Sequence, residues 1–480
     1  MTDTVFADAC ALAAAIRRGD VSAREAVDRV LDRIARLDGD LNAYALVDAD
    51  GARTAADRAD AKQALGGDLG PLHGVPFSVK DLIDTEGLET AFGSHLMAGN
   101  IPARDAATVA RLKSAGAILI GKTTTPEFAH KALTTSPRYG VTRNPWNLTR
   151  SPGGSTGGGA VAVAAGLAPL ALATDGAGSA RIPASCCGVL GLKATLGRIP
   201  NEAAADLFGN FIYHGAITRT TADLAAMANV IGGPDAGDPW TTAHENSPLT
   251  VPDDPVKALS GVRLTYLPLM GNRKLDPRVD TALRQTLYQL ATAGADVGEW
   301  RESDPDDWGN ELARVTIRAS LSIRMARFSP EQRAQMDPSL RQAIEESDAL
   351  DQRAVQAAPL QRTALFRRVE TLFAEADLLI TPTVSAPPPS AEHEAWEPLW
   401  IDGDVVGPLR ANWYNYPAPF NLTGHPAISI PCGWDDEGLP VGLQAIAPWH
   451  EDQRLIDLAA AIEVLQPWTD RWPDLATQDM

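Results

Sequence analysis

The stretch Thr174–Thr195, TDGAGSARIPASCCGVLGLKAT, is the most informative part of the 480-residue chain. It begins where an apolar run, Ala168–Thr174, predicts a buried strand, and its glycines at 176 and 178 predict a loop. A second glycine-rich loop, SPGGSTGGG at 151–159, lies upstream and is separated from the strand by a helix of small residues. The helix and the strand between the two loops are long enough for the chain to leave the first loop and come back beside it. The two loops are therefore expected to meet.

Strand-like and helix-like segments alternate outward from this unit. GVPFSVK at 74–80 is a short apolar strand that ends in Lys80, 106–115 reads as a helix, and AILIG at 117–121 reads as a buried strand. Further strands are predicted at 264–267, 378–381, 427–430 and 442–446, and helices at 278–292, 310–375 and 452–464. The alternation indicates an α/β sheet with helices on both faces. Because no repeat and no long linker divides the chain, a single domain over 1–480 is the simplest architecture.

The first 65 residues are predicted to be helical. Ser22 and Glu25 form a capping box, in which each side chain satisfies a free backbone N–H at the start of a helix. Apolar residues then recur at helical spacing: Ala26, Val30, Ile34 and Leu37.

The net charge of the chain excludes some classes of binding partner. Lys and Arg total 42 and Asp and Glu total 61, which gives a net charge of −19. A surface this acidic repels phosphates, so neither nucleic acid nor an anionic membrane is an expected partner. The four cysteines show no CxxC spacing, and the N-terminus lacks the pattern of a signal peptide. We therefore expect a soluble cytoplasmic protein with reduced cysteines.

Neither a metal nor a cofactor is expected. The eight histidines are scattered, with no HExxH and no Cys/His cluster. The loop at 151–159 has the glycines of a phosphate-binding loop but lacks the lysine and the preceding apolar strand.

Three residues together indicate a different chemistry. Lys80 ends an apolar strand, Ser155 lies in the first glycine-rich loop, and Ser179 lies in the second. A serine nucleophile needs a base, and no histidine is near either loop in sequence. A lysine can serve as that base if burial lowers its pKa from about 10.4 towards neutrality. Lys80 emerges from Phe77-Ser78-Val79, which makes its burial plausible.

Four segments resemble the amidase signature family. They are GVPFSVKDLID at 74–84, SPGGSTGG at 151–158, the stretch 174–195, and FNLTGHPAISIPCGWDDEGLPVGLQ at 420–444. The likeness spans about residues 5 to 465, with a signature core at about 70–215, and extends in part to the branch that hydrolyses oligoamides and cyclic dimers. It implies a single α/β/α domain around a large twisted mixed sheet, and hydrolysis of amide bonds through an acyl-enzyme intermediate.

The resemblance also implies a role for each residue. Ser179 would be the nucleophile, Lys80 the base, and Ser155 the bridging serine, which in the family follows a cis peptide bond. The oxyanion would lie against the backbone N–H groups from Gly176 through Ala177 and Gly178 to Ser179.

Two departures from the family pattern concern the pocket. The family commonly has TDTGGS where this chain has TDGAGS, so Ala177 replaces a glycine, which a negative φ would tolerate. The usual GKTN is GKTT, with Thr124 in place of asparagine, in a segment that continues to Ala129, a position that often lines the acyl pocket in the family. Arg181 and Asp175 resemble a structural ion pair.

The region at about 310–420 is predicted to be a variable, aromatic-rich entrance. Trp413, Tyr416 and Phe420 are its candidate pocket-lining residues, in an apolar funnel for a small aryl or alkyl amide, a lactam or a carbamate. The alternative is that these aromatic side chains pack in the core.

Two other functions remain open at this stage. One is the glutaminase component of a tRNA-dependent amidotransferase, which would need a partner subunit. The other is a non-enzymatic ligand-binding protein on an inactivated hydrolase scaffold. A free-standing amidase acting on a small-molecule amide is the preferred interpretation, with a homodimer as its candidate assembly.

Overall fold

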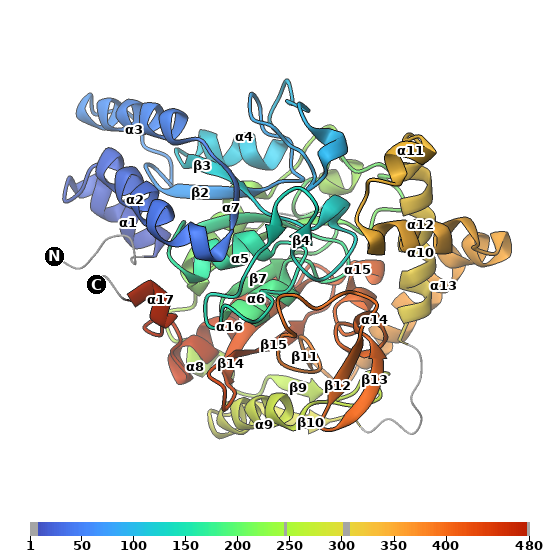
Figure 1. Ribbon diagram of the computed structural model, residues 1–480. Coiled ribbons are helices and arrows are strands. Elements are labelled where there is room, and N and C mark those ends of the chain that lie inside the picture. The colour runs from blue at the N-terminus through green and yellow to red at the C-terminus, as the bar shows by residue number, and fades with distance from the viewer. Residues whose placement is uncertain (1–7, 244–246, 301–307, 478–480) are drawn as a thin grey trace.

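An eleven-stranded mixed sheet forms the centre of the computed structural model, which describes residues 8–243, 247–300 and 308–477 (Figure 1). The strand order is β1-β3-β2-β6-β8-β7-β14-β15-β11-β9-β10. The strands are β1 (Tyr44–Val47), β2 (Pro76–Lys80), β3 (Ile118–Thr123), β6 (Leu170–Asp175), β7 (Leu190–Lys193), β8 (Tyr213–Thr218), β9 (Arg263–Tyr266), β10 (Asp296–Glu299), β11 (Leu378–Pro382), β14 (Ala427–Trp434) and β15 (Pro440–Ile446).

The sheet combines parallel and antiparallel pairs. Strand β2 is parallel to both of its neighbours, β3 and β6, whereas β6 and β8, β8 and β7, and β7 and β14 are antiparallel. Parallel strands place their carboxyl ends at the same edge, so Lys80 at the end of β2 and Asp175 at the end of β6 lie at one edge of the sheet.

Helices cover both faces of the sheet, as the sequence predicts. Leu170 and Leu172 of β6 belong to one core cluster and Ala171 and Ala173 to another, because successive strand residues point to opposite faces. Helices α4 (Ala107–Ser114), α7 (Thr221–Ile231), α9 (Pro277–Thr292) and α16 (Asp452–Leu465) supply the first cluster. Helices α1 (Ala9–Arg18), α2 (Ala23–Leu41), α5 (Gly157–Ala164) and α6 (Arg181–Cys187) contribute to the second. The arrangement is a three-layer α/β/α fold.

Helix α5 lies against the middle of the sheet and is entirely buried. Its sequence, GGGAVAVA, contains only small side chains, which lets its backbone approach neighbouring strands closely. At Gly158 an added Cβ would lie 2.4 Å from the carbonyl oxygen of Ala43. The glycines that distinguish this loop in the sequence are therefore needed for packing, and they hold Ser155 at the start of the helix.

The N-terminal segment differs in one respect from the helical prediction. The capping box of Ser22 and Glu25 is present at the start of α2, but strand β1 separates α2 from α3 (Ala49–Ala64). Strand β1, with the sequence YALV, pairs with β3 through Tyr44, Leu46 and Val47, and a stretch this short carries too little periodicity to be recognised. Strands β7, β8 and β10 are likewise absent from the sequence-based prediction.

The region 310–375 is helical but is divided into four helices. These are α10 (Asn310–Met325), α11 (Pro330–Arg333), α12 (Pro338–Asp348) and α13 (Gln352–Leu372), which lie together at one side of the sheet in Figure 1. Helices α11 and α12 each begin with a proline, where the missing N–H costs no helical hydrogen bond. No helix in the described ranges is long and apolar enough to cross a membrane.

The aromatic segment packs in the core instead of forming a funnel. Trp413 is fully buried and its indole N–H donates to the carbonyl of Ala386. Tyr416 is also fully buried and its hydroxyl donates to the carbonyl of Pro268, and Phe420 is buried in the same cluster as Tyr416. Because all three side chains are buried and none lines the cavity, the funnel interpretation of these residues is wrong and the core alternative holds. The number of aromatic residues in a sequence does not show which way they face.

Replacing Trp413 with Ala is expected to reduce the free energy of unfolding by about 3–5 kcal/mol, because a large buried side chain leaves a cavity. Chemical denaturation measures this change. Trp400→Ala is the matched control, since 62% of Trp400 is exposed, and its effect should stay within about 0.5 kcal/mol. Equal effects of the two substitutions would contradict the core assignment.

Candidate active site

Lys80 is fully buried at the carboxyl end of β2. Its Nζ lies 2.7 Å from Ser155 Oγ and 2.9 Å from Thr174 Oγ1, within hydrogen-bond distance of both hydroxyls. Burial lowers the pKa of Lys80 to about 7, and the negative charge of Asp175 only partly opposes this shift. The amine is therefore available in its neutral form near neutral pH.

Ser155 follows a cis peptide bond from Gly154, as the resemblance implies. Its side chain faces Lys80, and the next residue, Thr156, donates its backbone N–H to the carbonyl of Ser179 at 3.1 Å. This backbone contact joins the two glycine-rich loops directly. The sequence prediction that they meet is confirmed.

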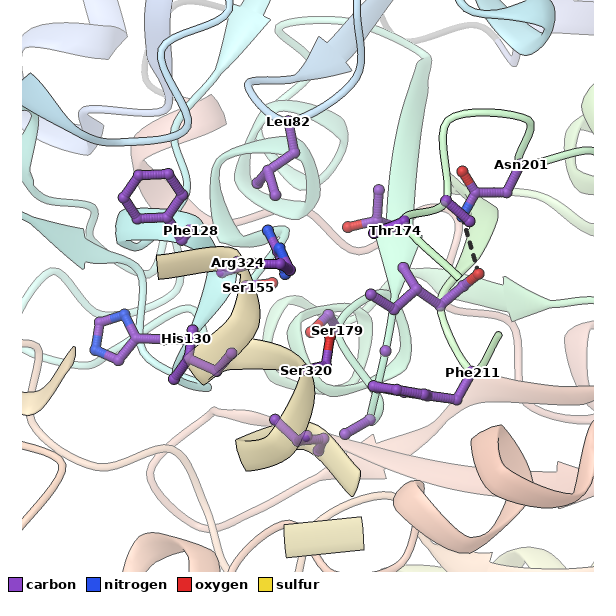
Figure 2. Close-up of a pocket in the computed structure, with 18 of the residues that line it drawn as sticks. Leu82, Phe128, His130, Ser155, Thr174, Ser179, Asn201, Phe211, Ser320 and Arg324 are labelled. Carbon is purple, nitrogen blue, oxygen red and sulfur yellow. Dashed lines mark hydrogen bonds between the residues drawn. The ribbon is translucent and has the colours of Figure 1, made fainter. Parts of the chain in front are cut away.

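Ser179 lies between strand β6 and helix α6, on the loop that starts at Gly176. The side chains of Ser155 and Ser179 line the same cavity, as Figure 2 shows. Among the described residues, Ser155 Oγ makes its hydrogen bond with Lys80, and the two serine hydroxyls are not hydrogen-bonded to each other. In many enzymes such catalytic contacts tighten only when substrate is bound.

A buried ion pair shapes the loop that carries Ser179. Arg181 Nη2 lies 2.9 Å from Asp175 Oδ1, and both side chains are 0% exposed. Asp175 also accepts the backbone N–H of Gly178 at 2.7 Å and that of Ala180 at 3.2 Å. Burial alone would raise the pKa of Asp175, but Arg181 and the hydrogen bonds from Asn421 and Gly178 hold it well below its usual range.

The loop backbone offers N–H groups to the cavity. Gly176 and Ala177 line it together with Ser179, and in the described structure the N–H groups of these three residues have no protein acceptor. Gly178 differs, because its N–H is already donated to Asp175 and its φ of 102° suits glycine. The prediction that all four N–H groups face an oxyanion therefore needs correction at Gly178. Ala177 is not among the residues with positive φ, so its methyl group is accommodated without strain.

The cavity has a volume of about 310 Å³. Phe128, Phe211 and Leu82 contribute apolar surface, while Thr174 and Asn201 are among its polar residues (Figure 2). A site of this kind, apolar with a few converging polar groups, suits a small organic ligand.

Of the remaining candidate residues, some line the cavity and others do not. Ala129 lines the cavity and has a positive φ of 57°. Thr124 does not line it, because its hydroxyl bonds to Thr142 Oγ1 at 2.7 Å and to Asn42 O at 3.1 Å. Trp413, Tyr416 and Phe420 are not among the lining residues either, whereas Tyr414 is.

Sequence reasoning missed several lining residues. His214 lines the cavity, and burial followed by repulsion from Lys80 lowers its pKa to about 4, so the ring is neutral at pH 7. One face of α10 also lines the cavity, although this helix lies more than 130 residues from Ser179 in sequence. Neither His214 nor the lining face of α10 lies in a local sequence motif that would identify it as part of the site. In the described part of the chain, no cluster of three or more His, Cys, Asp or Glu side chains could hold a metal ion.

Comparison with known proteins assigns the family. The chain matches the amidase family over residues 25–456 and therefore belongs to the amidase signature family. It is 36% identical over 471 residues to an acylamidase of Rhodococcus erythropolis, with 96% of each chain covered. It is 34% identical over 493 residues to the A subunit of the glutamyl-tRNA(Gln) amidotransferase of a Roseiflexus species, with 97% of each covered.

Solved structures agree with this assignment. A bacterial aryl acylamidase of the family superposes with a TM-score of 0.89 at 27% identity, covering 99% of each chain. A 6-aminohexanoate cyclic dimer hydrolase, in complex with substrate, gives a TM-score of 0.85 at 29% identity, covering 99% of this chain and 100% of that one. The protein is an amide-hydrolysing enzyme, so the alternative of a non-enzymatic binding protein is set aside.

Replacing Arg181 with Met is expected to reduce the free energy of unfolding by about 3–5 kcal/mol, because it leaves the Asp175 carboxylate buried without its counter-ion. The double substitution Asp175→Asn with Arg181→Met should recover part of this loss. Arg284→Gln breaks two largely exposed ion pairs, with Asp280 and Glu299, and should cost about 1 kcal/mol or less. Denaturant titrations compare the variants. A double variant less stable than Arg181→Met would argue against the charge explanation.

Proposed function

We propose that the enzyme hydrolyses a small-molecule amide through a Ser179–Ser155–Lys80 triad and an acyl-enzyme intermediate. The observation that carries the proposal is the 2.7 Å contact between the buried Lys80 amine and Ser155 Oγ, in the cavity that also holds Ser179. An uncharged amine in hydrogen-bond contact with a hydroxyl is suited to general-base catalysis near neutral pH.

In the first half of the reaction, Lys80 accepts a proton from Ser155 as Ser155 accepts one from Ser179. Ser179 Oγ then attacks the amide carbonyl and forms a tetrahedral intermediate. The N–H groups of Gly176, Ala177 and Ser179 are the candidate donors to its oxyanion, and losing one such donor typically costs about 10²–10³ in rate.

The second half of the reaction releases both products. The proton returns through Ser155 to the leaving nitrogen, the C–N bond breaks, and the acyl group stays on Ser179. Water, activated by the same relay, hydrolyses this ester and frees the carboxylate product. The Asp175–Arg181 pair holds the loop and takes no part in proton transfer.

Apolar side chains in the cavity favour an aryl or alkyl amide as the substrate. Phe128, Phe211 and Leu82 supply this surface, and the acylamidase and aryl acylamidase relatives are consistent with it. The likeness to the amidotransferase relative supports a second candidate, a glutaminase that acts with a partner protein. Ammonia release from glutamine, measured with and without candidate partners, separates the two.

Ser179→Ala is expected to abolish covalent labelling by a fluorophosphonate probe, because the attacking oxygen is removed. Mass spectrometry of the labelled protein identifies the modified residue. Ser185→Ala is the control, since Ser185 lies on α6 outside the cavity and its loss should leave labelling intact. Labelling that persists in Ser179→Ala would overturn the nucleophile assignment.

The pH profile should report the base. Below pH 7 the Lys80 amine is protonated and cannot accept a proton, so kcat/KM should fall about tenfold per pH unit below about pH 7 and level off above it. Lys80→Ala should lower kcat/KM by about 10²–10⁴-fold and remove the inflection. An inflection retained in the residual activity of this variant would point to a different base.

A further inference from the structure

One face of helix α10 lines the active-site cavity. Ile317, Ser320, Leu321 and Arg324 recur at intervals of three and four residues, which places them on the same side of the helix. The first three offer small or apolar surface. Arg324, in the last turn, lines the cavity together with Ser155 and Ser179, and Figure 2 labels all three.

Arg324 lacks an anionic partner in the ranges that the structure describes. Among the described residues, its guanidinium makes no hydrogen bond or ion pair with the protein. By contrast, Lys131 lies 2.8 Å from Asp337, and Arg318 lies 3.1 Å from Glu346. Burial, followed by repulsion from Arg327, lowers the pKa of Arg324, so its surroundings disfavour the charge that it carries.

The other charged groups around the cavity do not neutralise the charge of Arg324. His130 bonds to Ser339 at 2.6 Å, and Arg410 lies over the ring of Tyr414 at 5.6 Å. Two carboxylates, Asp84 and Asp206, line the cavity, but neither forms an ion pair with Arg324. Asp206 accepts the backbone N–H groups of its own loop.

An unpaired cation that is partly removed from water is costly unless a ligand supplies the missing anion. A guanidinium presents N–H donors in a planar fork that matches both oxygens of a carboxylate. The chain carries a net charge of −19, so a cation here is a local exception to the acidic surface.

A second, more open groove of about 680 Å³ meets the cavity at this point. Ser320, Arg324, Phe211 and Asp206 are among the residues that line both spaces. Arg324 therefore stands at the junction, and Phe211, Ile182 and Leu321 add apolar surface to the cavity that holds Ser179.

We infer that the preferred substrates are amides that carry a carboxylate, separated from the scissile bond by an apolar spacer, and that Arg324 binds this carboxylate. The inference rests on the proposed function, because it takes Ser179 as the point of attack. It assigns Arg324 a role in specificity and none in proton transfer.

Matched pairs of anilides test the inference. On the acyl side, the monoanilides of succinic, glutaric and adipic acid are compared with butyranilide, valeranilide and hexananilide. On the amine side, 4-acetamidobenzoate is compared with 4-methylacetanilide. Chromatography of the released aromatic amine gives kcat/KM for each substrate, and the arm that shows the preference locates the carboxylate.

The wild-type enzyme should favour the anionic member of at least one pair, and Arg324→Gln should reduce that preference by about 10- to 100-fold, as expected for the loss of a charge-assisted hydrogen bond. Hydrolysis of the neutral member should change less than about threefold. Arg324→Lys should keep part of the preference. Arg314→Gln removes the same charge from α10 at a residue paired with Glu311, outside the cavity, and should keep all of it.

Two results would overturn the inference. One is a wild-type enzyme with no preference for the anionic member of any pair, and the other is an Arg324→Gln variant that slows both members equally. Either result leaves the proposed function intact as long as Ser179 is needed for hydrolysis of the neutral anilides. Neutral anilide hydrolysis that continues in Ser179→Ala would instead refute the proposed function.

Discussion

The contact between Asp175 and Arg181 fixes the geometry on which the rest of the site depends. Arg181 bonds to Asp175 through Nε and Nη2, and its remaining N–H groups reach Asn421 Oδ1, Gln444 Oε1 and the carbonyl of Pro417. One buried guanidinium therefore joins the end of β6 to α15 (Ala418–Thr423) and β15. Because every one of its donors finds an acceptor in the protein, the cost of burying the pair is offset by hydrogen bonds, and these bonds anchor the loop between β6 and α6.

The same sheet holds three buried lysines whose surroundings differ. Lys122 is held by the carbonyl of Ile83 and two threonine hydroxyls, and Lys193 lies 4.0 Å from the ring centre of Tyr213. Lys80 alone of these three contacts a serine in the cavity. Burial lowers the pKa of each amine, so desolvation by itself does not identify a base. The adjacent hydroxyl and the access to substrate make the difference.

Sequence reasoning located the residues that the backbone constrains. The loops around Ser155 and Ser179 are recognisable because close packing of the backbone there requires glycine, and the resulting glycine clusters are visible in the sequence. Strand β8 was missed because YHGAIT mixes polar and small residues with no alternation. For Trp413 the sequence leaves two alternatives open, an entrance funnel and core packing, because aromatic content does not show which way a side chain faces, and the structure places it in the core. Arg324 was overlooked since an arginine on an amphipathic helix usually faces solvent, and only the tertiary fold turns it to the cavity.

The strand order has a consequence for biosynthesis. Strands β14 and β15 come late in the chain, yet they lie in the interior of the sheet, between β7 and β11. Until these two strands have been synthesised, β7 and β11 each lack one of the neighbours that they have in the finished sheet. Unpaired strand edges are templates for pairing with other chains, so a chain that is still missing β14 and β15 is exposed to aggregation at β7 and β11.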